Sequence, residues 1–137
     1  MTSTTQMTEL LASIYRSFAS GDASPWEQVL APDCLVIGTD EAEWWQGKGA
    51  VLPVIKAQLG QMSASGIRLT GGDAIVAEKG DLVWAADRPT LPLPDGTSTA
   101  RRATVVASRV EGSLVIEQFH LSAGGPNEEV VQQTLTL

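Results

Sequence analysis

The chain has 137 residues, nine basic and sixteen acidic side chains among them, and a formal net charge of −7 at pH 7. This length suits one domain with its own core, and a hydrophobic content of 43% argues against disorder. A surface of this charge repels phosphate backbones and anionic lipids, so we expect neither nucleic acid nor a membrane as a partner. No apolar run reaches the roughly 20 residues that span a bilayer, and the first residues lack a signal-peptide pattern.

A single cysteine, Cys34, excludes an internal disulfide and fits a reducing compartment, so we expect a cytoplasmic protein. The residues that follow it, Leu35–Ile37, are apolar, which predicts a buried and inert thiol rather than a reactive one. With one histidine and no clustered carboxylates, the chain offers no metal ligand set, and we expect neither a metal nor a cofactor.

Residues 1–5 form a polar stretch that we expect to be a flexible lead. Apolar residues at spacings of three and four then predict a helix over residues 6–20, which Gly21 ends as its C-cap. These residues are Met7, Leu10, Leu11, Ile14, Tyr15 and Phe18. The stretch Ser24–Glu27 has the pattern of a capping box, with serine as N-cap, and predicts a short second helix that Pro32 stops.

Residues 34–38 are apolar and predict a short strand. Residues 39–47 are polar and broken, so we interpret them as a loop. A third helix is predicted over residues 48–62, with Pro53 tolerated in its first turns. Its inward residues are expected to be Val51, Leu52, Ile55, Leu59 and Met62.

From Gly66 onward the sequence favours strands. Alternation predicts strands over residues 67–69, 75–78, 82–88, 97–110 and 114–121. Asp95–Gly96 and Glu111–Gly112 mark hairpin turns, and the prolines of residues 89–94 confine that stretch to an edge or a loop. A run of helices followed by a run of paired strands indicates an α+β fold.

Three short stretches occur in the same order in a known family: Phe18–Asp22 at the end of the first helix, Trp44–Gly47 before the third, and Ile116–Ser122 on the last strand. With them the chain resembles the SnoaL-like branch of the nuclear transport factor 2-like superfamily, which includes polyketide cyclases and ketosteroid isomerases. The resemblance covers nearly all of the chain and identifies residues 1–137 as a single SnoaL-like domain with a C-terminal tail over residues 125–137.

The resemblance implies a cone, in which a curved, mixed or antiparallel sheet of the cystatin-like type wraps over about three N-terminal helices. It also implies a cavity between the two layers and a homodimer formed through the outer face of the sheet. Because concave and largely apolar sites bind small molecules, we expect a small-molecule ligand in that cavity.

The ketosteroid isomerases use a carboxylate base after the first strand, a tyrosine on the first helix and a protonated acid on a late strand. Counted from Gly47 and from Asp22, the first two positions fall on Gly38 and Ile14. The third falls within Thr104–Val106. We therefore expect that mechanism to be absent.

The last strand carries the candidate residues His120 and Glu117. Strict alternation puts Leu114, Ile116, Gln118, His120 and Ser122 on one face and Val115, Glu117, Phe119 and Leu121 on the other. Either His120 faces the cavity as a proton carrier, or Glu117 and Phe119 do and His120 lies in the dimer interface. The alternation leaves both arrangements open.

Further candidates lie on neighbouring segments. Asp87 interrupts an apolar strand and points either to solvent or into the cavity, and either Arg101 or Arg102 of the next strand could pair with it across the hairpin. Of Trp44 and Trp45, one is expected to anchor its loop and the other to line the cavity mouth. Asp40 is a candidate for the rim. Trp26 and Trp84 are expected in the core.

Two functions follow. The first is a ligand-binding domain for a small, mostly apolar molecule, with Asp40, Trp44, Trp45, Asp87, Arg101, Phe119 and His120 as candidate binding residues. The second is a cofactor-free acid/base enzyme of isomerase, cyclase or hydratase type, in which Asp87, His120 or Glu117 transfers a proton. Fold alone does not decide between them.

Overall fold

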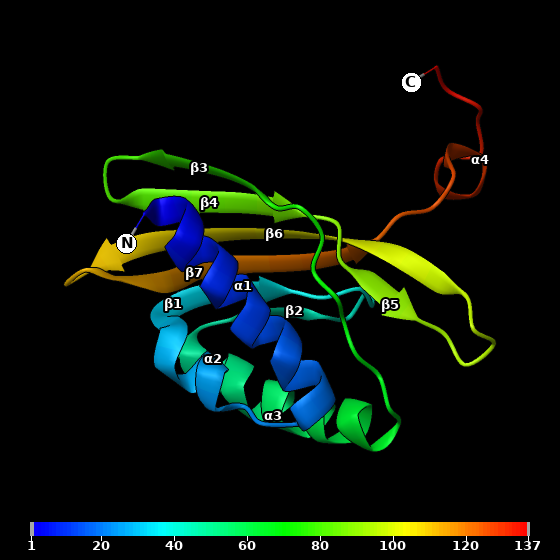
Figure 1. Ribbon diagram of the computed structural model, residues 1–137. Helices are drawn as coiled ribbons and strands as arrows, with labels where there is room; N and C mark the ends of the chain where they lie inside the picture. Colours follow the sequence, from blue (N-terminus) through cyan, green and yellow to red (C-terminus); the bar gives the residue numbers. More distant parts are fainter. Residues whose placement is uncertain (1, 137) are drawn as a thin grey trace.

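Three helices from the N-terminal half of the chain, with two strands between the second and the third, cover one face of a curved sheet in the computed structural model, which describes residues 2–136 (Figure 1). The helices are α1 (Ser3–Ser20), α2 (Ser24–Val29) and α3 (Lys48–Ala64). A short helix, α4 (Asn127–Val130), lies beyond the sheet near the C-terminus. Within the described residues, no helix combines the length and the apolar character needed to cross a bilayer.

The sheet is mixed and does not close. Its strand order is β2-β1-β7-β6-β4-β3, and β5 pairs only with β6. β1 runs parallel to β7, whereas every other pair is antiparallel. The strands are β1 (Leu30–Ile37), β2 (Trp44–Gln46), β3 (Ile75–Lys79), β4 (Leu82–Asp87), β5 (Thr90–Pro92), β6 (Ser98–Val110) and β7 (Ser113–Ala123). This arrangement confirms the expected α+β fold with a curved, unclosed sheet.

The core lies between the helices and the concave face of the sheet. The apolar stripe of α1 is buried as the spacing predicts, and α3 contributes Val51, Ile55 and Leu59. From the sheet come alternate residues of β4 and β6, such as Val83, Ala85, Val105 and Ala107. The alternation leaves a second, outward face, on which Trp84 is 40% exposed. The prediction of a core position for Trp84 was wrong.

The start of α1 differs from the expected flexible lead. Helix begins at Ser3, because Thr2 caps it by accepting a hydrogen bond from the backbone N–H of Thr5 (3.1 Å). Arg109 of β6 also donates to the Gln6 side chain (Nη1–Oε1, 2.6 Å) and to the Ser3 hydroxyl, which ties this first turn to the sheet.

The second helix starts and ends differently from its prediction. Ala23 is the N-cap, and Ser24 lies inside the first turn, where its backbone N–H donates to Asp22 Oδ1 (3.0 Å). Asp22 therefore accepts from the Ser24 N–H, the donor that the capping box assigned to the Glu27 side chain. The helix ends at Val29 rather than at Pro32, which lies within β1 where the pairing with β7 shifts its register. A proline has no N–H for the ladder, which explains an irregularity there.

Two segments exchange their predicted conformations. Residues 44–46, interpreted as loop, form β2 and pair with residues 35–37 of β1. Residues 67–69, predicted as strand, lie in an irregular crossover from α3 to β3 that forms only an isolated bridge from Thr70 to Thr90. Composition misled both predictions, because a three-residue edge strand needs little apolar pattern and a crossover along the core can contain apolar residues.

A β-bulge in β7 changes which side chains face the core. Val106 of β6 pairs with Gln118, but the next residue, Ala107, pairs with Ile116, so Glu117 is an extra residue on β7. The inward series consequently runs Leu114, Ile116, Phe119 and Leu121. The half of the strand before the bulge follows one of the two expected alternations and the half after it follows the other, so neither holds over the whole strand.

Candidate functional site

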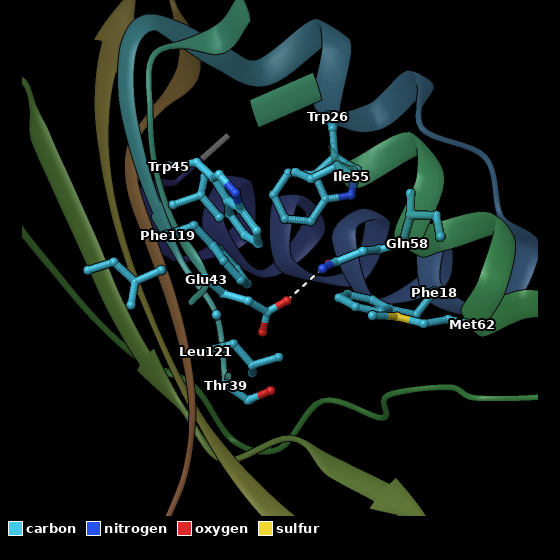
Figure 2. Close-up of a pocket in the computed structure, with 14 residues that line it drawn as sticks. Phe18, Trp26, Thr39, Glu43, Trp45, Ile55, Gln58, Met62, Phe119 and Leu121 are labelled. Carbon is cyan, nitrogen blue, oxygen red and sulfur yellow. Dashed lines mark hydrogen bonds between the residues drawn. The ribbon is translucent and has the colours of Figure 1, made fainter. Parts of the chain in front are cut away.

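An apolar pocket lies between the helices and the concave side of β1, β2 and β7 (Figure 2). Its volume is about 70 Å³. Aromatic side chains from four elements line it, namely Phe18 of α1, Trp26 of α2, Trp45 of β2 and Phe119 of β7. Aliphatic side chains of α3 and the sheet complete the wall. The polar side chains that reach it are Thr39, Glu43 and Gln58.

The inner aromatic wall is held in a fixed arrangement. Trp26 packs edge-to-face against Phe119, with ring centroids 5.3 Å apart and an interplanar angle of 80°. The Trp26 indole N–H donates to the Ser17 hydroxyl (2.9 Å), and that hydroxyl donates to the carbonyl of Ile14 one helical turn earlier. Because both rings and the indole donor are engaged, this side of the pocket is preformed.

Glu43 is the acidic group of the pocket. Gln58 Nε2 of α3 donates to Glu43 Oε2 at 2.6 Å, as Figure 2 shows, and the backbone N–H of Asp40 donates to Oε1 at 2.8 Å. Each carboxylate oxygen thus has one donor from the protein. An ionised carboxylate can accept about four hydrogen bonds, so acceptor capacity remains for a ligand.

Gly38 makes room for this carboxylate. A Cβ at that position would lie 2.6 Å from Glu43 Oε1, 2.8 Å from Cδ and 2.9 Å from Cβ, all too close for a side chain. The backbone brings the two residues together, since Gly38 N–H donates to the Glu43 carbonyl (2.9 Å). Because Gly38 has no side chain, the Glu43 side chain can occupy the space beside it.

Of the candidates from the sequence, two line this pocket. Trp45 lies opposite Val36 and faces inward, and Phe119 forms part of the inner wall. Trp44 pairs with Ile37, points to the other face of the sheet and is 61% exposed. The adjacent tryptophans thus serve opposite faces of the sheet.

Asp40 and Arg101 lie outside the pocket. Asp40 is exposed and accepts from the backbone N–H of Ala42 (2.8 Å), which stabilises the turn between β1 and β2. Arg101 donates to the Thr99 hydroxyl (2.8 Å) and does not approach Asp87, whose cross-strand neighbour is Ala103. Among the described residues, no ion pair joins Asp87 to an arginine.

Asp87 points inward into a second hollow, between α1 and the crossover of residues 68–74. It is buried and accepts from Tyr15 Oη (2.7 Å) and from the backbone N–H groups of Arg88 (2.8 Å) and Gly72 (3.1 Å). Burial, then the hydrogen bond to Asp87 and its charge, raise the pKa of Tyr15. Gly72 passes so close that a Cβ would lie 2.9 Å from the Arg88 carbonyl. This network fastens the crossover to the sheet.

His120 and Glu117 both lie on the outer face. His120 pairs with Thr104 on one side and with Ile37 on the other. Glu117 Oε1 accepts from the hydroxyl of Ser108 (2.8 Å). Ser108 lies opposite Leu82, whose side chain is exposed on the outer face, so Ser108 and Glu117 lie on that face as well. In residues 2–136, no three histidine, cysteine or acidic side chains are grouped so that they could hold a metal ion.

Sequence reasoning missed Glu43, Gln58 and Trp26 as pocket residues. The position of Gln58 carries a signal, because it lies three residues after Ile55 and four before Met62 on the inward stripe of α3. Glu43 carries none, since its approach to the pocket depends on the pairing of a three-residue strand. Trp26 was assigned to the core, and it lines the pocket from a buried position.

The chain belongs to the family of SnoaL-like domains, whose family model matches residues 7–126. No curated protein matches the chain. Solved structures share the fold. A nuclear transport factor 2-like protein of unknown function from Pseudomonas putida KT2440 is 21% identical, with a TM-score of 0.78 over 98% of this chain and 96% of that one.

An uncharacterised protein with a cystatin-like fold from Caulobacter vibrioides is 14% identical, with a TM-score of 0.77 over 95% of this chain and 98% of that one. A candidate dehydratase of the nuclear transport factor 2-like family from Streptomyces avermitilis is 16% identical. It has a TM-score of 0.75 over 89% of this chain and 96% of its own. At these identities the likeness establishes the fold and leaves the function open.

Proposed function

We propose that the domain binds a small, mostly apolar molecule in the pocket between its helices and β1, β2 and β7. The observation that carries this proposal is the lining, in which four aromatic side chains surround a hollow with one carboxylate. A pocket of this composition takes its affinity from burying an apolar ligand surface and its orientation from a few polar groups.

The volume limits how much of the ligand enters. About 70 Å³ is below the 300–1,000 Å³ of typical ligand sites and about half the size of an engineered cavity that holds benzene. We expect the inner end of the ligand to lie beside Trp26 and Phe119. The remainder extends past Thr39 and Leu121, which lie next to each other in Figure 2.

A thermal-shift screen of small aromatic and alicyclic molecules tests this proposal, because a ligand that binds the native state raises the melting temperature by mass action. Leu121→Trp would place an indole in the pocket and is expected to abolish the shifts. Leu82→Trp is the matched control, since Leu82 lies in the same sheet on the outer face and is exposed. Hits that survive Leu121→Trp unchanged would contradict the proposal.

A second candidate function is proton transfer without a cofactor, and the contact between Glu43 and Gly38 favours it. Gly38 is the position to which the isomerase resemblance assigns the base, and the Glu43 carboxylate occupies the space beside it. Glu43 would accept a proton from one atom of the ligand and return it to another. Deuterium incorporated from D₂O into recovered ligands, and lost in Glu43→Gln, would support this function.

We further propose a homodimer formed through the outer face of the sheet. Several large apolar side chains of that face are exposed, which is unusual for a surface that stays in water. They are Trp44, Ile75, Leu82, Trp84 and Val110. In such a dimer His120, in the middle of the same face, would lie in the interface.

A cytoplasmic location remains part of the proposal. Cys34 is a free cysteine with no exposed surface, and burial raises the pKa of its thiol, so it stays protonated and unreactive. Such a cysteine is compatible with a reducing compartment. Fractionation of the source cells, with detection by antibody, tests the location.

A further inference from the structure

The carboxylate of Glu43 presents hydrogen-bond acceptors to the pocket. Its two oxygens each receive one hydrogen bond, from Gln58 Nε2 (2.6 Å) and from the backbone N–H of Asp40 (2.8 Å). Both protein partners are donors, so the carboxylate is held in place as an acceptor. An ionised carboxylate has no proton to donate.

The rest of the wall offers few other polar groups. The Trp26 indole N–H is already donated to Ser17, so it does not reach a ligand. Gln58 directs one of its two amide N–H groups to Glu43, and the other donors of the wall are the Thr39 hydroxyl and the Trp45 indole N–H. A ligand group placed against the Glu43 oxygens themselves meets acceptors. A donor there forms a charge-assisted hydrogen bond, whereas a group that can only accept forms none with them and binds more weakly.

The charge of the site points the same way. No lysine or arginine lines the pocket, and Glu43 is the charged side chain that an anion would meet there. An anionic ligand would have to lose its hydration next to a carboxylate of the same sign, which is unfavourable. A neutral hydroxyl or amine, or a cation, would not pay this cost.

We infer that the pocket selects ligands whose inner end is a hydrogen-bond donor on an apolar ring, such as a phenol or an aromatic amine, and rejects acceptor-only and anionic ligands of the same shape. Glu43 is the residue that determines this specificity, with Gln58 and Gly38 as positioning residues. The inference rests on the proposed binding function and names the ligand class for the same site.

Three probes of similar size test it: phenol, which donates; anisole, which only accepts; and benzoate, which is an anion. Binding is measured by NMR titration of the wild-type protein. We expect phenol to bind on the order of 10-fold more tightly than anisole, as one hydrogen bond to a charged group implies, and benzoate not to bind.

Glu43→Gln replaces the carboxylate by an amide of the same shape and is expected to reduce the preference for phenol to about threefold or less. Glu41→Gln is the matched control, an isosteric change at an exposed carboxylate of the same turn, and it should keep the full preference. Gly38→Ala is a second route, because its Cβ would displace the Glu43 side chain and should lower the preference in the same way.

The outcomes separate the two proposals. If phenol and anisole bind equally well, or if Glu43→Gln keeps the wild-type preference, the pocket binds apolar molecules but the inference on ligand class is overturned. If benzoate binds as tightly as phenol, the inference is overturned as well. If none of the three probes binds, the proposed binding function itself fails, and the inference fails with it.

Discussion

Asp87 is a buried carboxylate whose oxygens are held by several hydrogen bonds. Its oxygens accept from the Tyr15 hydroxyl and from the backbone N–H groups of Gly72 and Arg88, so its acceptor positions are largely used within the protein. The network joins α1, β4 and the crossover before β3. We infer that its role is to fix these three segments, although the sequence alone made Asp87 a candidate for catalysis.

Tyr15 provides a direct test of that network, because it is the only tyrosine in the chain. Burial and its hydrogen bond to Asp87 raise the pKa of its phenol above the ordinary value of about 10. The folded state therefore holds the proton more tightly than the unfolded state. This stabilisation is fully present below about pH 10 and is lost as the pH rises further.

In a spectrophotometric alkaline titration, we expect no tyrosinate absorbance at the pH where an exposed tyrosine ionises. The signal should appear only as the protein unfolds. In Asp87→Asn the carboxylate charge is absent, so the phenol should ionise at lower pH than in the wild type. A wild-type titration midpoint near pH 10 in the folded protein would contradict the burial of this pair.

Gly38→Ala tests the fit of the Glu43 side chain. The new Cβ would lie within 3 Å of three Glu43 atoms, so the side chain must move. We expect the free energy of unfolding to fall by about 1–3 kcal/mol, as for other overpacked sites. Gly49→Ala is the control, since a Cβ there meets nothing within 4 Å and the residue lies in α3, where alanine is favourable. Equal stability of the two variants in denaturant titrations would contradict the fit.

At the scale of elements, the bulge in β7 decides which residues reach the pocket. If β7 contained the same residues but no bulge, strict alternation after Ile116 would turn Phe119 outward and His120 inward. The bulge instead keeps Leu114, Ile116 and Phe119 on the same inward face. Because of the bulge, Phe119 lies in the pocket wall and His120 lies on the outer face of the sheet.

Deletion of Glu117 tests this role. Without Glu117, only Gln118 separates Ile116 from Phe119, so regular alternation keeps both side chains inward and the pairing of Val106 with Gln118 is retained. We therefore expect the variant to fold, with a loss of about 1–3 kcal/mol in the free energy of unfolding. Glu117→Gln keeps the residue count and changes only the contact to Ser108, which should cost about 1 kcal/mol or less. A deletion variant that no longer folds would contradict the assignment of Glu117 as the extra residue.

The elements that the sequence predicted well have strong local patterns. Residues 10, 14 and 18 of α1 recur at helical spacing, and the turns at residues 95–96 and 111–112 fix two hairpins. β2 and the bulge depend instead on how consecutive strands pair, which no local residue pattern marks. Trp45 and Phe119 were candidates because of the size of a tryptophan and the alternation of the last strand, whereas Glu43, which reaches the pocket only when β2 pairs with β1, was not.

At the scale of the whole molecule, the proposed dimer gives the outer sheet face a function. Trp84 lies on that face between Ala77 of β3 and Val106 of β6, so it belongs to the same continuous surface. We expect the wild type to sediment as a dimer at micromolar concentration and Trp84→Glu to sediment as a monomer. Two charges buried in a two-fold interface without partners would be unfavourable.

Val130→Glu is the control for that experiment, since Val130 is an exposed apolar residue on α4, away from the sheet. This variant should remain dimeric. A monomeric wild type would remove the dimer from the account, and a dimeric Trp84→Glu variant would move the interface to another surface.

The indole N–H signals of the four tryptophans, followed in an NMR titration with phenol, report directly whether a ligand binds in the pocket. Trp26 and Trp45 line the pocket, whereas Trp44 and Trp84 lie on the outer face. Tryptophan-to-phenylalanine variants assign the signals. We expect saturable shifts of the Trp26 and Trp45 signals while the other two stay in place. Shifts confined to Trp44 and Trp84, or no shifts at any of the four, would contradict binding in the pocket.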